Sequence, residues 1–401
     1  MISVEDAYQR LLGAAEPVRR TESVSLREAA GRVLAEDVLA KRTQPGFDAS
    51  AMDGYALRAE DAQAPFRPLR VIGESAAGRA FEGRVEPGEA VRIFTGAPVP
   101  EGADAILIQE DAERSEDGAL VPKEEVSTGQ HIRSAGVDFS AGSILLGQGT
   151  LLSSGAVALA ASGGHPHLTV LARPKVAVLA TGDELVSPGE PVGPSQIVAS
   201  NSYGVAALVE ACGGSVVDCG IAPDREDEIA AHLDRALSDG CDCFVTIGGA
   251  SVGDHDLIGK VFEAKKVEIA FLKVAMRPGK PLMAGRIGDM RLVGLPGNPA
   301  SSMVAATLFL APLVRRLAGR PDALLTRAAI LGSDVPENGT RADFMRSKTE
   351  LRADGTLIVM PLPRQDSSLL SIYAAADALL MRPPHAPAAR AGEACHIVDL
   401  V

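Results

Sequence analysis

The pattern of apolar and polar positions changes near residue 173 and divides the chain into regions of different texture. Beyond Arg173-Pro174, short apolar runs typical of strands buried on both faces alternate with amphipathic stretches typical of helices. This alternation predicts a doubly wound parallel α/β sheet. The predicted strands are KVAVLAT (175–181), SVVDCGIA (215–222), CFVTIGG (243–249), VEIAFLKVA (267–275) and RLVGLPG (291–297). The predicted helices run from a capping Asn201 to Cys212, over 226–240, and from Pro299 to about Ala318.

The flanking regions lack this alternation. Ser3 with Asp6 resembles a capping box and predicts a helix to about Leu12, and Ser25 with Glu28 predicts a second helix. Short β-like runs separated by Gly and Pro follow, then Gly-rich turns around one Ala-rich helix, GAVALAAS (155–162). After Gly319-Arg320-Pro321 the chain returns to β-like runs.

These textures predict a multidomain protein of α/β and β parts. Four domains are expected: an N-terminal helical and mixed domain (1–46 plus 125–172), an inserted β-rich domain (47–124), an α/β domain (173–322) and a C-terminal all-β, barrel-like domain (323–401).

Composition narrows the class of function. The net charge of −13, the absence of Trp and an aromatic content of 3% argue against nucleic-acid binding, which needs basic stripes or stacking platforms. No apolar run reaches the roughly 18 residues of a membrane span, and the first residues do not resemble a signal peptide, so we expect a cytoplasmic protein without membrane contact. Five cysteines do not suggest a disulfide framework. P-loop, G-x-S-x-G and Rossmann fingerprints are also absent.

The stretch FVTIGGASVGDHD (244–256) carries the strongest chemical signal. Its glycines allow close approach to an anion, yet Asp254 and Asp256 would repel a phosphate unless a cation lay between them. Glu184 and Asp224 follow two other predicted strands. Carboxylates at neighbouring strand ends would converge on one crevice and form a Mg²⁺-type site. Alternatively, each acid only caps or begins its own helix.

Two further segments suggest oxyanion binding. Lys273, Arg277 and Lys280 surround a Pro-Gly turn and could focus positive charge, although a solvated basic turn is the plainer interpretation. GLPGNP (294–299) opens a helix at Pro299, whose first amides could face an anion.

Seven motifs, in this order, closely resemble the MoeA family of molybdopterin molybdenumtransferases, which is related to the E domain of gephyrin. They are FDASAMDGYALR (47–58), RIFTGAPVPEGADA (92–105), HIRSAGVDF (131–139), TGDEL (181–185), GGASVGDHD (248–256), KVAMRPGKP (273–281) and GLPGNPAS (294–301). The resemblance covers nearly the whole chain and weakens after about residue 325. It implies a molybdopterin-binding-like α/β domain and insertion of molybdate into adenylylated molybdopterin, with Mg²⁺-dependent release of AMP.

The resemblance also implies roles for individual residues. The implied catalytic residues are Asp53, Glu184, Asp224, Asp256, Lys273 and Lys280, of which Glu184, Asp224 and Asp256 are the implied metal ligands. The implied substrate-binding residues are Thr95, Asp138, Gly248, Gly249, Ser251, Gly253, Arg277, Pro296, Pro299, Arg346 and Ser367. Arg277 departs from family members that carry Lys there.

Partners follow from the same resemblance. It implies an elongated homodimer with a shared active site, in which the β-rich domain of one subunit reaches the crevice of the other. It also implies an upstream molybdopterin adenylyltransferase, and molybdoenzymes or chaperones as acceptors. Two alternatives remain: molybdopterin adenylylation, whose enzyme resembles residues 174–320 alone, and a non-enzymatic scaffold like the gephyrin E domain.

Overall fold

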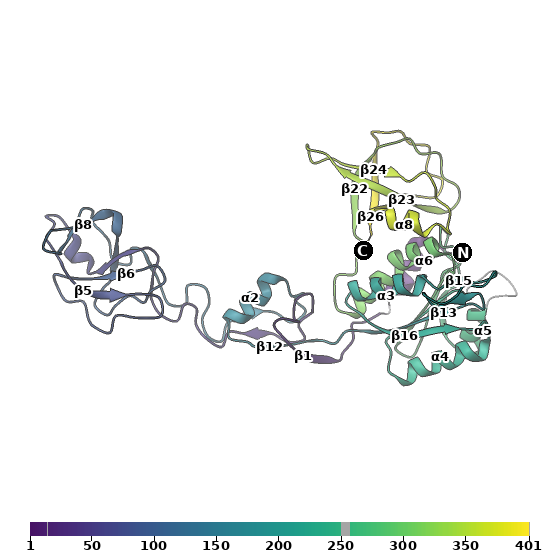
Figure 1. The fold of residues 1–401 in the computed structure, drawn as a ribbon, viewed down its shortest axis with the longest axis horizontal. Coiled ribbons are helices and arrows are strands. Elements are labelled where there is room, and N and C mark those ends of the chain that lie inside the picture. The colour runs from purple at the N-terminus through teal and green to yellow at the C-terminus, as the bar shows by residue number, and fades with distance from the viewer. Residues whose placement is uncertain (14, 250–256, 401) are drawn as a thin grey trace. The chain divides into compact units, whose positions relative to one another are not determined.

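The computed structural model describes residues 1–13, 15–249 and 257–400, and the chain divides into two compact units. The first unit combines Met1–Glu22 with Leu171–Val401, and the second is Ser23–Val170. Each unit has hydrophobic cores of its own and is described by itself (Figure 1). Residues 1–22, which we predicted to lie with 125–172, pack within the first unit: Ala7 and Leu11 belong to its largest core.

A mixed sheet forms the centre of the first unit. Among the described residues its strand order is β16-β13-β17-β21-β20-β18. The strands are β13 (Lys175–Thr181), β16 (Ser215–Ala222), β17 (Cys243–Ile247), β18 (Glu268–Phe271), β20 (Met283–Ile287) and β21 (Met290–Leu295).

The predicted parallel, doubly wound sheet is present, and antiparallel strands extend it at one edge. β16, β13, β17 and β21 are parallel, as expected for alternating strands and helices. β20, which the sequence pattern did not reveal, pairs antiparallel with both β21 and β18. Only Gly288 and Asp289 separate β20 from β21, and a link that short permits a hairpin but no parallel crossover.

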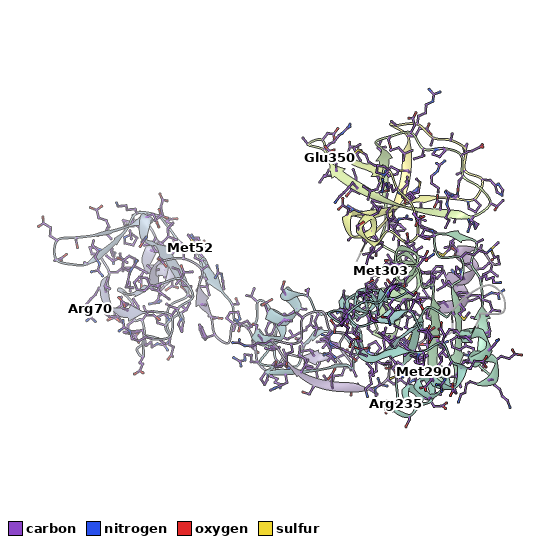
Figure 2. All side chains as sticks on the ribbon, turned by 45° about the vertical axis from the view of Figure 1, so that its right-hand side comes forward. Met52, Arg70, Arg235, Met290, Met303 and Glu350 are labelled. Carbon is purple, nitrogen blue, oxygen red and sulfur yellow. The ribbon has the colours of Figure 1, made fainter. Side chains whose placement is uncertain are left out.

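Alternate residues of the central strands face two separate cores. Val176 and Val178 of β13 join one core, whereas Ala177 and Leu179 join the other, as the two-residue period of a strand requires. Figure 2 labels one methionine from each core, Met303 and Met290. The helices of the first core are α1 (Val4–Leu12), α3 (Asn201–Ala211), α6 (Pro299–Ala305), a π-helical turn (Ala306–Leu310) and α7 (Ala311–Leu317); those of the second are α4 (Glu226–Ser238) and α5 (Leu257–Ala264).

Two of these helices match particular sequence predictions. Ser3 caps α1, since its Oγ accepts a hydrogen bond from the amide of Asp6 at 3.0 Å. Pro299–Leu317 forms a helix of 19 residues, long and apolar enough to cross a membrane, but 89% of its most apolar window is buried inside the protein. It is therefore the core helix of this unit.

The C-terminal part of the first unit is a small barrel, as predicted. Its long strand β23 pairs with both β24 and β25, which closes the sheet β23-β24-β22-β26-β25. A short strand from the α/β region, β19 (Met276–Arg277), adds to β23. The barrel elements are β22 (Thr326–Leu331), β23 (Ala342–Leu351), β24 (Leu357–Pro361), β25 (Ala378–Arg382), β26 (Ala394–Asp399) and the short helix α8 (Leu370–Ala375).

The second unit is β-rich, in agreement with the Gly- and Pro-punctuated sequence. Its main sheet has the order β5-β6-β4-β7, formed by β4 (Gly54–Leu57), β5 (Arg70–Ser75), β6 (Glu89–Ile93) and β7 (Ala105–Ile108). Smaller strands and one helix complete it: β2 (Val38–Leu39), β3 (Ala49–Ser50), β8 (Ala112–Arg114), β9 (Leu120–Pro122), β10 (Ile132–Arg133), β11 (Ile144–Leu146) and α2 (Ser154–Ser162). Two further strands, β1 (Thr21–Ser25) and β12 (His167–Leu171), pair with each other.

The helix predicted after Ser25 is wrong. The backbone amide of Ser25 does donate to Glu28 Oε2 at 3.4 Å, as in a capping box, but only a turn follows. Gly31 adopts φ +73°, which a continuing helix cannot accommodate, and Val33 and Leu34 instead bridge to Leu151 and Val170.

Because the two units have separate cores, replacing a large buried side chain by alanine should lower the free energy of unfolding of its own unit only. Phe309→Ala removes a fully buried ring and should lower the free energy of unfolding of the first unit by about 3–5 kcal/mol. Leu107→Ala, in the core of the second unit, is the matched control. Urea unfolding followed by hydrogen exchange should show each variant shifting a different transition; a shift of both transitions together by either variant would contradict separate cores.

Candidate functional site

A crevice of about 650 Å³ opens in the first unit where the parallel strands β13, β17 and β21 end. Open α/β sheets bind their ligands at this edge, outside the carboxyl ends of the strands. Six residues that we predicted as site residues line it together: Glu184, Asp224, Gly248, Gly249, Pro296 and Pro299.

The turn after β17 can only be built from glycines. Gly248 has φ +95°, and a Cβ there would lie 2.5 Å from the carbonyl oxygen of Thr181. Gly249 has φ +64°, and its Cβ would lie 2.9 Å from Thr181 Oγ1. The turn therefore packs directly on the end of β13. Thr181 Oγ1 is buried and has no hydrogen-bond partner within the described part of the chain.

Acidic side chains crowd one wall of the crevice. Asp224 and Glu184 both line it, and Asp183 Oδ1 accepts a hydrogen bond from the amide of Asp224 at 3.1 Å. Partial burial raises the pKa of Asp224, and the negative charges of Asp183 and Glu184 raise it further. A bound cation would relieve this repulsion.

The predicted third metal ligand cannot be placed. Asp256, together with Ser251 and Gly253, lies outside the described residues. Within residues 1–13, 15–249 and 257–400, no group of three His, Cys, Asp or Glu side chains is arranged to hold a metal ion. Two carboxylates nevertheless suffice for Mg²⁺ when substrate phosphates and water supply its other ligands.

The barrel also contributes to the crevice lining, near the start of α6. The carbonyl of Ser367 accepts a hydrogen bond from the amide of Ala300 at 2.9 Å, and its Oγ accepts one from Asn298 Nδ2 at 3.1 Å. The next residue, Ser368, lines the crevice. One of the free helix amides that we predicted to face an anion is thus bonded to the barrel.

The predicted basic residues, Lys273, Arg277 and Lys280, are not among the described residues that line the crevice. Lys273 lines a separate hollow of about 410 Å³ with Met1 and Ile2. Lys280 is partly buried, and its carbonyl accepts a hydrogen bond from the amide of Val274 at 3.1 Å. From this segment only Pro281 reaches the crevice wall.

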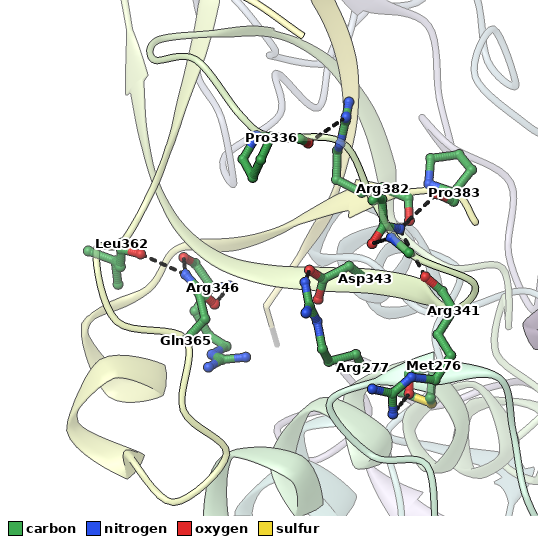
Figure 3. A network of polar contacts seen from close by, with 12 residues as sticks. Met276, Arg277, Pro336, Arg341, Asp343, Arg346, Leu362, Gln365, Arg382 and Pro383 are labelled. Carbon is green, nitrogen blue, oxygen red and sulfur yellow. Dashed lines mark hydrogen bonds and ion pairs between the residues drawn. The ribbon is translucent and has the colours of Figure 1, made fainter. Parts of the chain in front are cut away.

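Arg277 and Arg346 each make polar contacts with residues of the barrel, drawn in Figure 3. Arg277 forms an ion pair with Asp343, a β23 residue that is only 6% exposed. Arg346 is 1% exposed and donates from Nη2 to the carbonyl of Asp366 at 3.1 Å. Burial lowers the pKa of Arg346, while the charge of Asp343 opposes that shift.

Asp53, Thr95 and Asp138 lie in the second unit. Asp53 Oδ1 accepts hydrogen bonds from both the amide and the Oγ1 of Thr95, each at 2.7 Å, and these bonds lower the pKa of Asp53. The pair locks two loops of this unit to each other, which is a structural role in itself. Asp138 is exposed, and its amide donates to the carbonyl of Gln44 at 3.1 Å.

Sequence reasoning missed several crevice residues. The short strands β14 (Leu185–Val186) and β15 (Ile197–Val198) supply an apolar rim, where Ile197 is 56% exposed. We predicted that Asn201 caps α3, but the capping position is Ser200 without a side-chain bond. Instead, Asn201 Nδ2 donates to the carbonyl of Gly297 at 2.8 Å and braces the loop before α6. A strand of two residues is too short to show the alternation of apolar and polar positions that identifies strands in a sequence. The adjacent TGDEL motif is the only sequence signal near this rim.

Comparison with known proteins gives matches along the whole chain. Three family models match in succession: "MoeA N-terminal region (domain I and II)" over residues 2–164, "Probable molybdopterin binding domain" over 177–316, and "MoeA C-terminal region (domain IV)" over 328–400.

Individual relatives match at full length. A molybdopterin molybdenumtransferase of Haemophilus influenzae is 35% identical over 383 residues, covering 95% of this chain and 94% of the relative. Molybdopterin molybdenumtransferase 2 of Mycobacterium tuberculosis is 37% identical over 410 residues, covering 100% of both chains. A molybdopterin biosynthesis protein from Pyrococcus horikosii has a similar structure, with a TM-score of 0.84, 30% identity and coverage of 100% of this chain and 99% of that one.

The crowded carboxylates predict an unusual response to substitution. Asp224→Asn should raise the thermal midpoint near neutral pH, because it removes a charge that burial and the neighbouring acids disfavour. A raised pKa means that folding favours protonated Asp224, so stability is lost as pH rises through that pKa and is fully present below the ordinary carboxyl range. The difference in thermal midpoint between Asp224→Asn and the parent protein should therefore vanish on acidification. The melts are recorded without divalent cations.

The exposed Asp227 provides the control, because its ion pair with Arg225 lowers its pKa instead. Asp227→Asn should not raise the midpoint at any pH. A midpoint for Asp224→Asn below that of the parent protein at neutral pH would contradict the electrostatic account of the crevice.

Proposed function

From the premise that this chain belongs to the MoeA family, we propose that it inserts molybdate into adenylylated molybdopterin and releases AMP. Its function is molybdenum cofactor biosynthesis, and it is a transferase. The observation that carries the proposal is the convergence of Glu184, Asp224 and the Gly248-Gly249 turn in one crevice at the strand ends. A glycine turn suits an anionic substrate, and the acids suit the cation that such a substrate brings with it.

We propose that Mg²⁺ assists at the acidic wall. Glu184 and Asp224 would hold it, with Asp256 as the third candidate from the sequence. When bound, the ion would polarise the phosphoanhydride and neutralise charge that develops on the leaving AMP. Burial raises the pKa of Asp224, and the charges of Asp183 and Glu184 raise it further. The repulsion that these two acids add supports the assignment, because a divalent cation would remove it.

The chain's own residues then act by positioning and charge neutralisation, and no covalent nucleophile is needed. The glycine turn would let main-chain amides approach the phosphate, while the rim of Ile197 and Val198 would shield the substrate from water. Lys273 and Lys280 remain proposed oxyanion contacts, which would require a substrate or partner subunit that reaches them.

Neither alternative has comparable support. Adenylylation of molybdopterin needs only the α/β domain, whereas residues 2–164 and 328–400 also match MoeA regions. A purely structural scaffold would have no use for a crevice with crowded carboxylates, which cost stability.

We also propose a homodimer in which Asp53 and Thr95 of one subunit complete the crevice of the other. The exposed carboxyl group of Asp53 supports this, because its second oxygen, Oδ2, has no recorded bond in the part of the chain that the structure describes. In a cytoplasmic setting, a molybdopterin adenylyltransferase would supply the substrate, and molybdoenzymes or their chaperones would receive the product.

Glu184→Gln should weaken the binding of Mg²⁺ to the crevice, because it removes one of the two carboxylates proposed to hold the ion. We expect the Mg²⁺ concentration for half-maximal, molybdate-dependent AMP release to rise by at least about tenfold. Loss of a residue that only hydrogen-bonds a metal ligand already lowers metal affinity by about that factor. Purified adenylylated molybdopterin and molybdate are the substrates, and Asp227→Asn is the control for loss of a nearby surface charge. An unchanged Mg²⁺ dependence would refute the acidic wall as the cation site, and no AMP release by the parent protein would refute the proposed function.

Mixed dimers should test the shared site. At limiting Mg²⁺, Asp53→Asn and Glu184→Gln should each lose most of their activity alone, since each impairs both sites of its homodimer. After unfolding and co-refolding, about a quarter of the wild-type rate should return, because half of the randomly formed dimers are mixed and each of these has one intact site. Recovery no greater than the sum of the two separate homodimers would exclude a site shared between subunits.

A further inference from the structure

The guanidinium group of Arg92, on β6 of the second unit, contacts two aromatic rings. Its Cζ lies 5.0 Å from the centre of the Tyr55 ring and 4.9 Å from the centre of the Phe94 ring. Tyr55 is the cross-strand partner of Arg92 on β4 and is only 8% exposed, and Phe94 directly follows β6. A planar guanidinium can stack on aromatic rings and still donate hydrogen bonds in its own plane, which the ammonium group of a lysine cannot do.

The hydrogen bonds of Arg92 go to the main chain beside Asp53 and to a neighbouring loop. Nη1 donates to the carbonyl of Gly54 at 3.0 Å, and Nη2 donates to Gln109 Oε1 at 2.7 Å. The amide of Gln109 in turn donates to the carbonyl of Asp53 at 3.1 Å. Two consecutive carbonyls, those of Asp53 and Gly54, are therefore held by one connected set of contacts that centres on Arg92.

The side chain of Asp53 is oriented by Thr95. Asp53 Oδ1 accepts hydrogen bonds from the amide and from Oγ1 of Thr95, each at 2.7 Å. Both residues are exposed, so side-chain burial does not fix their positions. Arg92 acts on both members of the pair: it bonds the main chain next to Asp53, and its guanidinium contacts the ring of Phe94, the residue before Thr95.

We propose that Arg92 is a positioning residue for the shared active site, because it fixes the exposed pair of Asp53 and Thr95 in the arrangement in which that pair would enter the crevice of the other subunit. Arg92 acts through this pair and does not itself contact substrate. The kinetic consequence rests on the proposed function, whereas the structural consequence does not.

The first test is hydrogen exchange, which needs no substrate. Arg92→Lys keeps the positive charge and removes the planar group. It should speed exchange at the amide of Thr95 by about tenfold, because that amide is protected by its bond to Asp53. The control is Arg70→Lys (Arg70 is labelled in Figure 2), which alters an exposed arginine paired with Glu89 in the same sheet and should leave the Thr95 amide unchanged. Unchanged exchange in Arg92→Lys, or equal change in the control, overturns the proposal.

A second variant covers the case in which Arg92→Lys does not fold. Gln109→Ala removes one hydrogen-bond acceptor of Arg92 from an exposed position and leaves the amide of residue 109 in place. It should speed exchange at the Thr95 amide in the same direction and by a smaller factor. No change in this variant would show that the pair does not depend on the contacts of Arg92.

The kinetic test asks whether Arg92 acts through Asp53. With adenylylated molybdopterin and molybdate, Arg92→Lys should lower kcat/KM for AMP release by about 10- to 100-fold, as expected for a misplaced group, and Arg70→Lys should leave it unchanged. Asp53→Ala removes the side chain that Arg92 positions. Adding Arg92→Lys to that variant should then change kcat/KM by less than about twofold, because residues that act together do not give additive losses. A purely structural role for Arg92 would lower kcat/KM by the same factor in both backgrounds.

These results separate the two proposals. A parent protein that releases no AMP refutes the proposed function, while hydrogen exchange still decides whether Arg92 holds the pair of Asp53 and Thr95. An active parent protein in which the losses from Arg92→Lys and Asp53→Ala are additive leaves the proposed function intact and overturns the positioning role.

Discussion

The register of three parallel strands is the constraint on which the site depends. Ala180 of β13 pairs with Ile247 of β17, and Ile247 pairs with Leu295 of β21. The three strands therefore end at one level, and the loops that follow them begin side by side. Because a shift by one residue would turn every buried side chain to the wrong face, the two cores on either side of the sheet fix this register. The chemistry of the crevice is thus a consequence of core packing.

The C-terminal barrel is part of this arrangement. It meets the α/β region through β19 and β23, and through Ser367 at the start of α6. A third contact lies deeper, where Tyr373 of α8 hydrogen-bonds Thr307 in the π-helical turn at 2.9 Å. π-turns displace side chains from regular helical positions and commonly mark functional segments. Here the turn gives the barrel a buried polar anchor on the core helix.

The crevice also contains features that cost stability in the free protein. Burial and two neighbouring acids disfavour the charged form of Asp224, and Ile197 and Val198 are exposed apolar side chains on the rim of the crevice. Thr181 holds a buried hydroxyl without a partner in the described residues. Functional sites commonly retain such costs, because the same groups are stabilised when substrate and cation are bound.

The sequence by itself determined most helices and strands, because hydrophobic period and turn residues are local signals. It also placed four crevice residues in the loops that follow predicted strands: Glu184, Asp224, Gly248 and Pro299. It also indicated the family, through seven ordered motifs. Only the tertiary structure decided what has no local signal. The engagement of Arg277 by Asp343 and the bracing of Gly297 by Asn201 each join residues distant in the chain. The place of β20 between β18 and β21 likewise depends on strand pairing that no residue pattern showed. A charged side chain can pair with any opposite charge or polar group that folding brings close to it. Its partner therefore depends on tertiary packing rather than on its neighbours in sequence.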